Sequence, residues 1–388
     1  MLVLDICLTS VRRTKNRVSA RPATRRSPAN PAAGRPEAPA SARVRDFASP
    51  AAGYAIEWDV RPVYDFLFSL AKEEDSPEDL PEADRTWRTE ARAALVADLG
   101  DAADEGFASG MAVHIAAVAV ERPELRTVDA FLDTVGSLPT ADLVQSILSD
   151  FARDPDLGEL VERASAGDAD AMAALRETMP EHKAGFQALL ADPDGAHRRI
   201  VRILRAWATP FATIEPRISA ILQRDHALRA ADRGTLSDAE LIERTTGGIR
   251  WLPEVGIRRV VLAPSYFNRP YNYLLAGDDW RFFGYPVADD ALEAEDRLAP
   301  PPAVVRLHRA LGDETRLRIL KLLSGHDLYL TEIAQQLELS KPTISHHLAL
   351  LRAAGLVTIV EEGSVTYYSL RRDRIETAST DLAQFLVS

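Results

Sequence analysis

The residues best suited to bind another molecule lie in the segment Ser340 to His347. It reads SKPTISHH and combines a lysine, three hydroxyl side chains and two imidazoles, with no carboxylate. Side chains of these types bind phosphate oxygens and the edges of bases in duplex DNA. The segment therefore predicts a contact with nucleic acid.

A helix is expected to present these side chains. Ser340 can cap it, and Gly355 can end it in the left-handed conformation. Its predicted buried face repeats at spacings of three and four: Ile344, His347, Leu348 and Leu351. The opposite face is small, polar and free of carboxylates, and consists of Pro342, His346, Ala349 and Ala353, flanked by Lys341, Thr343 and Ser345.

The neighbouring elements complete a recognisable order. Asp313 can cap a helix that ends at Gly325, and Thr331 can cap a shorter helix with Ile333, Ala334 and Leu337 inward. Two apolar runs follow Gly355, at residues 356–360 and 365–370, around the hairpin signal Glu362-Gly363-Ser364. This order predicts a helix-turn-helix followed by a wing.

The strings ALGDETRLRILKLL, LTEIAQQLELSKPTISHHLALLRAAGLV and EEGSVTYYSL resemble the winged-helix domain of the ArsR-type family of bacterial repressors. The resemblance covers residues 304–388. It implies that the helix from Lys341 to Ala354 reads double-stranded operator DNA, that the Gly363 hairpin lies along the DNA backbone, and that two flanking helices, 304–311 and 373–386, pair two subunits. The seam of the last helix would be Ile375, Ala378, Leu382 and Phe385. The expected DNA-binding residues are Ser340, Lys341, Pro342, Thr343, Ser345, His346, His347, Arg352, Ser364 and Arg371.

This sequence departs from the family pattern in two places. Metal-sensing members carry a Cys-x-Cys pair where this chain has Tyr329 and Thr331, and no histidine follows His347 for a site on the last helix. Because soft metals need thiolates or imidazoles, we expect no metal site there and no cofactor. The wing carries Glu361 and Glu362, which repel phosphate, so Arg371 and Arg372 are expected to replace its contact.

Charge divides the chain into three. Residues 1–50 carry a net charge of +7 and are rich in Pro, Ala and Arg, which predicts a disordered tail; a DNA-binding basic arm or a transit peptide are the alternatives. Residues 303–388 carry no net charge. Because the whole chain carries −12 and residues 1–50 carry +7, residues 51–302 carry a net charge of −19. The single Cys7 excludes an internal disulfide and is typical of a reducing cytoplasm, where we expect the protein. No apolar run reaches the length of a membrane span.

Residues 51–298 are predicted to form an α-rich domain with a few strands. Strands are expected at 55–60, 248–253, 258–267 and 280–287, and helices at 62–71, 85–99, 127–135, 140–151, 168–178, 183–190, 196–208 and 215–232. Eight of the 26 aromatic residues fall between Tyr266 and Tyr285. They predict a sheet core, and some could also line a ligand pocket. The candidates for that pocket are Tyr266, Phe267, Arg269, Tyr271, Tyr273 and Trp280, with Asn268 and Asn272 as further polar contacts.

The expected fold class is mainly α with small β elements: a C-terminal winged helix-turn-helix, a proline linker at 299–303 and an N-terminal α-rich, α+β domain. The predicted function is a homodimeric DNA-binding transcriptional regulator, a repressor whose N-terminal domain senses a small non-metal effector. A protein-interaction or dimerisation module in that domain is the alternative. The sequence contains no Gly-rich phosphate loop, no G-x-S-x-G turn and no H-E-x-x-H motif. An enzyme fused to the DNA-binding domain is therefore only a remote alternative.

Overall fold

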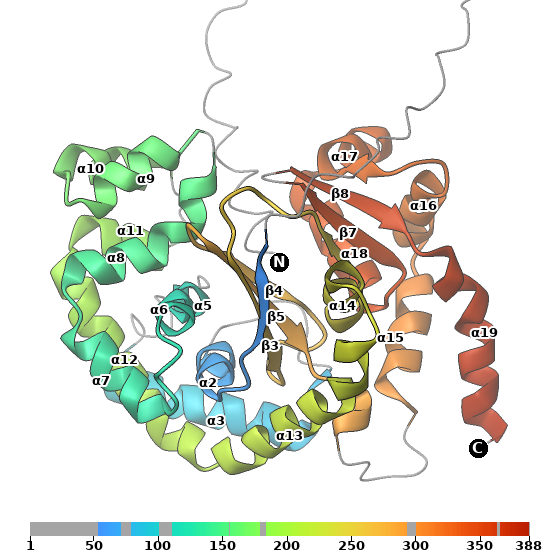
Figure 1. Ribbon diagram of the computed structural model, residues 1–388, viewed down its shortest axis with the longest axis horizontal. Coiled ribbons are helices and arrows are strands. Elements are labelled where there is room, and N and C mark those ends of the chain that lie inside the picture. The colour runs from blue at the N-terminus through green and yellow to red at the C-terminus, as the bar shows by residue number, and fades with distance from the viewer. Residues whose placement is uncertain are drawn as a thin grey trace, which may run out of the picture.

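The computed structural model describes residues 53–70, 79–100, 111–154, 156–178, 184–292, 300–362 and 365–387. The predicted basic tail and the hairpin tip at Gly363 and Ser364 lie outside these ranges. Figure 1 shows two parts side by side: a larger body, coloured blue to yellow, and a winged helix in orange and red. The expected fold class, a mainly helical chain with small sheets, is confirmed.

A four-stranded sheet forms the centre of the body. Its strands are β1 (Ala55–Trp58), β3 (Arg259–Ser265), β5 (Trp280–Pro286) and β4 (Tyr273–Ala276), in that spatial order. β1, β3 and β5 are parallel, and β4 is antiparallel to β5. Successive side chains alternate between the two faces, so Phe282 joins the helical core while Phe283 joins a second cluster with Ile242 and Trp251. The aromatic segment is therefore buried on both faces of the sheet.

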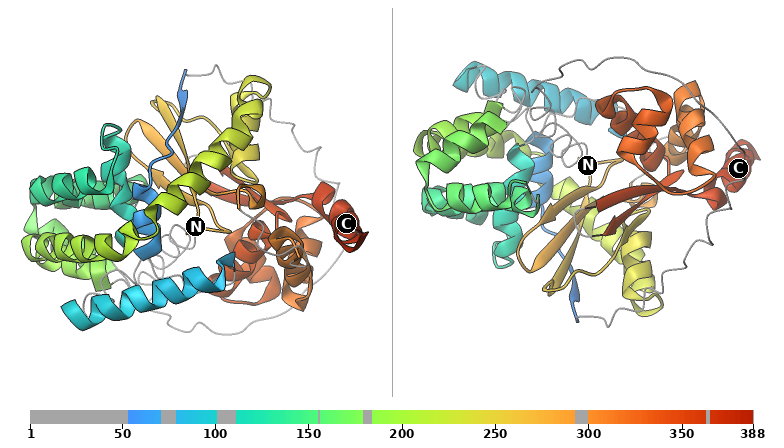
Figure 2. Two further views of the ribbon diagram at one scale, coloured as in Figure 1. Left: turned by 90° about the horizontal axis from the view of Figure 1, so that it is seen from below. Right: turned by 90° about the horizontal axis from the view of Figure 1, so that it is seen from above.

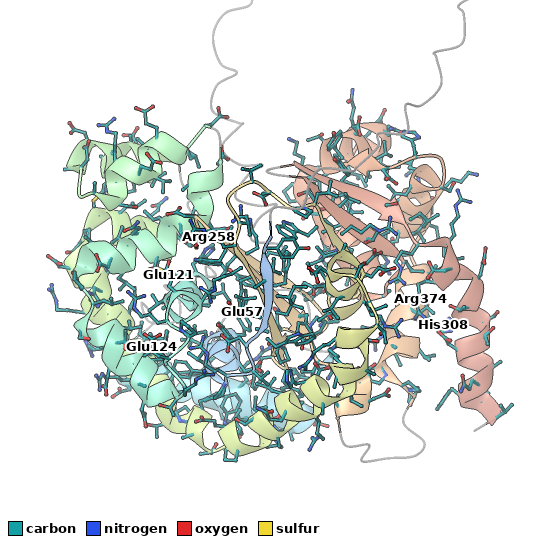
Figure 3. The ribbon with its side chains drawn as sticks, in the orientation of Figure 1. Glu57, Glu121, Glu124, Arg258, His308 and Arg374 are labelled. Carbon is teal, nitrogen blue, oxygen red and sulfur yellow. The ribbon has the colours of Figure 1, made fainter. Side chains whose placement is uncertain are left out.

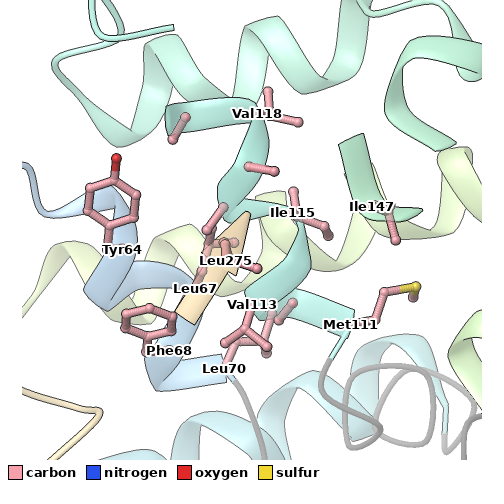
Figure 4. Close-up of a cluster of buried hydrophobic side chains, with 14 of the residues drawn as sticks. Tyr64, Leu67, Phe68, Leu70, Met111, Val113, Ile115, Val118, Ile147 and Leu275 are labelled. Atoms are coloured by element: carbon pink, nitrogen blue, oxygen red, sulfur yellow. The ribbon is translucent and has the colours of Figure 1, made fainter. Parts of the chain in front are cut away.

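Helices surround this sheet as an arc (Figures 1 and 2). They are α2 (Val63–Leu70), α3 (Glu82–Leu99), α5 (Met111–His114), α6 (Ala116–Glu121), α7 (Val128–Ser137), α8 (Thr140–Leu148), α9 (Gly158–Ser165), α10 (Ala169–Thr178), α11 (Ala184–Ala191), α12 (Pro193–Ala212), α13 (Glu215–Leu228) and α14 (Asp238–Thr245), with short 3₁₀ turns η3 (Ser149–Arg153), η4 (Arg229–Gly234) and η5 (Asp289–Ala291). Every residue of α2 is buried, and Figure 4 shows its Leu67 and Phe68 beside Val113, Ile115 and Leu275. Among the described helices, none has both the length and the apolar character needed to cross a bilayer.

The predicted body helices are confirmed, with boundaries shifted by a few residues. The body elements that we did not predict are α5, α6, α9, α14, β4 and the short turn η5. α5 and α6 come from the run MAVHIAAVAV, whose residues are all buried. A helix that is buried on every side has no polar face, so its sequence lacks the amphipathic period by which a surface helix is predicted.

A buried carboxylate fixes the turn after β3. Asp65 of α2 is fully buried and accepts hydrogen bonds from Ser265 Oγ at 2.8 Å, Tyr266 N at 3.0 Å and Phe267 N at 2.8 Å. Burial raises the pKa of Asp65 to about 6, although these three donors act in the opposite direction. The folded state thus binds a proton more tightly at Asp65 than the unfolded chain does.

This linkage predicts a pH-dependent effect of Asp65→Asn. The stability gained from the raised pKa is present near pH 4 and is lost as the pH rises through about 6. Asparagine keeps an acceptor oxygen and does not titrate, so wild type should lose about 1–3 kcal/mol relative to Asp65→Asn between pH 4.5 and pH 7. Urea unfolding of both proteins at the two pH values measures this difference. An equal difference at both pH values would contradict the assignment.

The C-terminal part has the order expected of a winged helix. It contains α15 (Pro302–Leu311), α16 (Glu314–Leu323), β6 (Leu328–Tyr329), α17 (Leu330–Leu337), α18 (Lys341–Ala353), β7 (Val357–Glu362), β8 (Val365–Leu370) and α19 (Arg372–Val387). Asp313 caps α16 as predicted, accepting from Arg316 N at 2.9 Å. α17 begins at Leu330, and Glu332 accepts from Tyr329 N at 2.9 Å, so the predicted cap at Thr331 is wrong by two residues. Leu307, Ile333, Ile344 and Leu351 meet in a separate apolar core.

The body and the winged helix share a sheet. β2 (Ile249–Trp251) pairs in parallel with β7, in the register Ile249 to Ile359, and gives the strand order β2-β7-β8-β6. The strand predicted at 248–253 was expected to join the other body strands, and this prediction is wrong, because β2 belongs to the sheet of the winged helix. The expected proline linker is also shortened, because Pro302 already belongs to α15. The two parts are therefore joined by strand pairing as well as by the chain.

Candidate nucleic-acid interface

The turn before α18 sets the direction of that helix. Glu338 ends α17 in the left-handed conformation, with φ of 57°, an unusual conformation for a residue other than glycine. Ser340 then caps α18: its Oγ accepts from Thr343 N at 3.3 Å and lies 2.7 Å from Thr343 Oγ1. Pro342 occupies the first turn, where its missing N–H costs no helical hydrogen bond.

The two fully exposed residues of α18, Pro342 and Thr343, lie in its N-terminal half. Lys341 and His346 beside them are half-buried. The helix contributes no carboxylate to this surface. A surface that is small, polar and without negative charge fits against phosphates and base edges. We call Lys341, Pro342, Thr343 and His346 the α18 surface.

Ser345 and Ala349 do not belong to this surface. They were predicted to face outward, but Ser345 is 4% exposed and Ala349 is 2% exposed. α18 packs against α15, α16, α17 and β7, so more of its circumference is covered than one apolar stripe suggests. The side chain of Ser345 is therefore not accessible to DNA in this structure.

The two neighbouring histidines differ in their surroundings. The His347 side chain is 15% exposed, with Nδ1 at 3.8 Å from Asp313 Oδ1. Burial lowers the pKa of His347 below its usual value, although the nearby Asp313 acts in the opposite direction. His346 lies on the outward arc, and its ring centroid is 5.9 Å from that of His347. His346 is therefore better placed than His347 for a contact with DNA.

Arg352, near the end of α18, and two predicted contacts after the wing, Arg371 and Arg372, lie elsewhere. Arg371 extends toward the body, with Nη1 donating to Gly247 O at 3.5 Å, and Arg372 donates to Ser324 O at 2.5 Å. Arg352 and Arg371 both line a cavity between the body and the winged helix. The expectation that Arg371 and Arg372 replace the wing contact is not supported by these positions, and Ser364 lies outside the described residues.

The predicted aromatic pocket is not formed by its six candidates together. Tyr266, Phe267, Tyr273 and Trp280 are each at most 4% exposed and lie in the body core. Arg269 and Tyr271 instead border the cavity beside the winged helix, together with Asn272. The polar candidate Asn268 donates from Nδ2 to Tyr271 O at 2.9 Å and holds this loop.

Sequence comparison agrees with this geometry. The profile of bacterial regulatory proteins of the arsR family matches residues 313–358, from the cap of α16 into β7. Transcriptional repressor SdpR of Bacillus subtilis is 36% identical over 78 residues, which are 20% of this chain and 87% of SdpR. The chain belongs to the ArsR family. It is a DNA-binding transcriptional regulator, and the family resemblance seen in the sequence is confirmed.

Other ArsR-family relatives match the chain over a similar length. HTH-type transcriptional regulator CmtR of Mycobacterium tuberculosis is 37% identical over 86 residues, 22% of this chain and 73% of CmtR. Transcriptional activator HlyU of Vibrio cholerae is 39% identical over 74 residues, 19% of this chain and 68% of HlyU. No solved structure matches the chain significantly.

Ser340 allows capping and DNA contact to be separated. Ser340→Ala removes the cap and should lower the free energy of unfolding by about 1 kcal/mol. Ser340→Asp keeps a capping oxygen, so its stability should stay close to wild type, but it adds a negative charge beside the α18 surface and should weaken DNA binding about tenfold. Urea unfolding and fluorescence anisotropy with labelled DNA measure the two effects. Equal DNA affinity of Ser340→Asp and wild type would place this end of α18 away from phosphate.

Proposed function

We propose that this ArsR-family regulator is a homodimer whose two α18 surfaces enter successive major grooves, and that it represses transcription until a non-metal effector binds the body. The observation that carries the proposal is the α18 surface itself. A lysine, a hydroxyl and an imidazole project from a helix whose other sides are held by a continuous apolar core. Such a rigid platform is what direct reading of base edges requires.

Dimerisation is supported by the last helix. α19 contacts α15 within the chain, yet Ile375 is 38% exposed, Leu386 is 71% exposed and Val387 is 85% exposed. An exposed apolar strip on a helix favours burial against a partner. In the predicted seam, Leu382 and Phe385 are half-buried, and the Ala378 side chain lies outside the described part of the chain. A pair of α15–α19 units would set the spacing of two α18 helices.

Regulation by the body is supported by the β2–β7 pairing. Gly248 O accepts a hydrogen bond from Ile359 N at 3.1 Å, so a shift of the body moves the first strand of the wing. The body does not favour DNA by itself, because residues 51–302 carry a net charge of −19. Two of its glutamates, Glu121 and Glu124, lie on the side away from α18 (Figure 3).

The proposal is tested by footprinting the full-length protein on the promoter region of its own gene. We expect two protected half-sites with roughly palindromic sequences, about 10 base pairs apart or a multiple of that spacing. A single half-site protected at saturation would contradict the dimer, and no protection at modest ionic strength would contradict the proposal as a whole.

A further inference from the structure

A cavity of about 250 Å³ lies where the body meets the winged helix. Body segments form one side: the end of α14 with the turn at 245–248, the loop at 269–272 and residues 286–289 at the end of β5 and just after it. The winged helix forms the other side, with residues of α15, the C-terminal end of α18 at 352–355, and the start of α19. The cavity therefore touches both parts that a regulatory ligand would have to couple.

The charged residues that line the cavity are almost all of one sign. Seven arginines and a single carboxylate, that of Asp289, border it. This is opposite to the strongly acidic character of residues 51–302 as a whole. The arginines are Arg229, Arg244, Arg269, Arg306, Arg352, Arg371 and Arg374.

Three of these arginines are held tightly and form the walls. Arg229 Nε is 2.9 Å from Asp225 Oδ2, and Arg269, which is 1% exposed, lies 2.5 Å from Asp289 Oδ1. Arg306 reaches the other oxygen of Asp289 at 3.2 Å. Buried ion pairs of this kind hold a fixed geometry, because separating one would leave a charge uncompensated.

Three others have longer and more solvated contacts. Arg244 is 68% exposed and lies 3.4 Å from Asp232, while Arg374 is 32% exposed and lies 3.6 Å from Asp381. Arg371 is 27% exposed, lies 3.2 Å from the 65% exposed Asp373 and contacts the Gly247 carbonyl at 3.5 Å. Solvated pairs of this kind contribute little, so these guanidinium groups can turn toward a ligand.

We propose that this cavity binds a small metabolite carrying phosphate or carboxylate groups. A guanidinium group offers a planar fork of donors that matches both kinds of anion, and several forks facing one space select a ligand with more than one negative oxygen. The volume suits a small metabolite and excludes a DNA duplex. This inference rests on the proposed function, because it names the class of effector that the regulator would sense.

A ligand in this cavity would contact the C-terminal end of α18, the helix proposed to bind DNA. Arg352 and Gly355 at the end of α18, Val357 of β7 and the Gly247–Gly248 turn that precedes β2 all border it. An anion held between Arg244 of the body and Arg374 of α19 changes how the body holds the winged helix. By linkage, a ligand that prefers one arrangement of the two parts changes the affinity of the protein for DNA.

The test uses full-length protein and two probe anions, inorganic phosphate and citrate, at an ionic strength matched with sodium chloride. Isothermal titration calorimetry compares wild type with Arg244→Gln/Arg374→Gln. The control is Arg163→Gln/Arg205→Gln, which removes two exposed, ion-paired arginines of the body that do not line the cavity. We expect at least one probe to bind wild type and control saturably, and the cavity variant at least tenfold more weakly. The same probe should change the affinity of wild type for its promoter fragment at least fivefold, and that of the cavity variant much less.

Each other result overturns the inference. Absence of saturable binding by both probes, or equal binding by the cavity variant, excludes the anion site even if the promoter fragment is bound normally. Binding that leaves DNA affinity unchanged excludes the effector role. If the cavity variant loses DNA affinity without any probe, the arginines contact the DNA backbone instead. Failure of the proposed function is a separate outcome, since wild type would then bind no promoter fragment at all.

Discussion

Replacing Lys341 and His346 together with alanine is expected to lower the affinity for the operator at least about 30-fold, because in each subunit a phosphate contact and a base contact contribute about 1–2 kcal/mol each, and about 1.4 kcal/mol corresponds to a tenfold change. Both side chains leave α18 on its outward side, and neither belongs to the apolar core of the winged helix. The midpoint of unfolding of this double variant should therefore equal that of wild type. Fluorescence anisotropy at several salt concentrations measures the loss, and the magnitude of the slope of log affinity against log salt should fall by about two, one for the lysine of each subunit.

The matched control is Lys321→Ala/His326→Ala. This pair removes the same two residue types from exposed positions of the same winged helix, at the end of α16 and in the loop after it. Its DNA affinity should remain within about twofold of wild type, since only distant, screened charge is changed. If the two double variants lose affinity equally, net charge and not the α18 surface governs binding.

Replacing Arg61 with alanine is expected to lower the free energy of unfolding by about 3–5 kcal/mol. Arg61 is 4% exposed and joins the end of β1 to the loop after α6. Its guanidinium donates to Asp59 at 2.7 Å, to the carbonyl oxygens of Arg122 and Leu125 at 2.9 and 2.7 Å, and to Ala119 O at 2.8 Å. Alanine removes these donors from one carboxylate and three carbonyl groups in a buried corner, and Asp59 loses its ion-pair partner. Urea unfolding followed by circular dichroism measures the cost.

Arg205→Ala is the control for Arg61. Arg205 also forms an ion pair, with Asp133 at 3.1 Å, but the two side chains are 55% and 76% exposed. Solvent-exposed pairs of this kind contribute little, so the free energy of unfolding should stay within about 0.5 kcal/mol of wild type. Similar losses for the two variants would mean that the buried network around Arg61 does not hold the body together.

The winged helix was predictable from sequence because its signals are local. The caps at Asp313 and Ser340 lie beside the helices that they start, and the apolar spacing of α18 fixes its buried stripe. The prediction failed at Ser345 and Ala349, where burial depends on four neighbouring elements instead of on the helix period. A periodic pattern gives the direction of a buried face but not its width.

The contacts that unite the two parts of the chain are non-local. β2 pairs with β7 more than 100 residues away, and three residues are too short to show where their strand belongs. The seven arginines of the cavity come from six separate segments of the sequence, so no spacing indicated that Arg244 and Arg374 would border one cavity. The aromatic cluster correctly predicted the core of the sheet, because strand-forming aromatic residues are close together in the sequence. Whether the same residues line a pocket depends on which side chains the fold leaves exposed, and the sequence does not show this.

The most direct test of the central claim places a DNA-cleaving iron chelate on α18. In a Cys7→Ser background, which removes the single native cysteine, a cysteine substituted for Thr343 carries the chelate, and one substituted for the exposed Thr89 of α3 is the control. The α18 surface predicts strong strand cleavage at two positions within the operator, one in each half-site. Cleavage from position 343 that is as weak and as dispersed as cleavage from position 89 would contradict the placement of this helix in the groove.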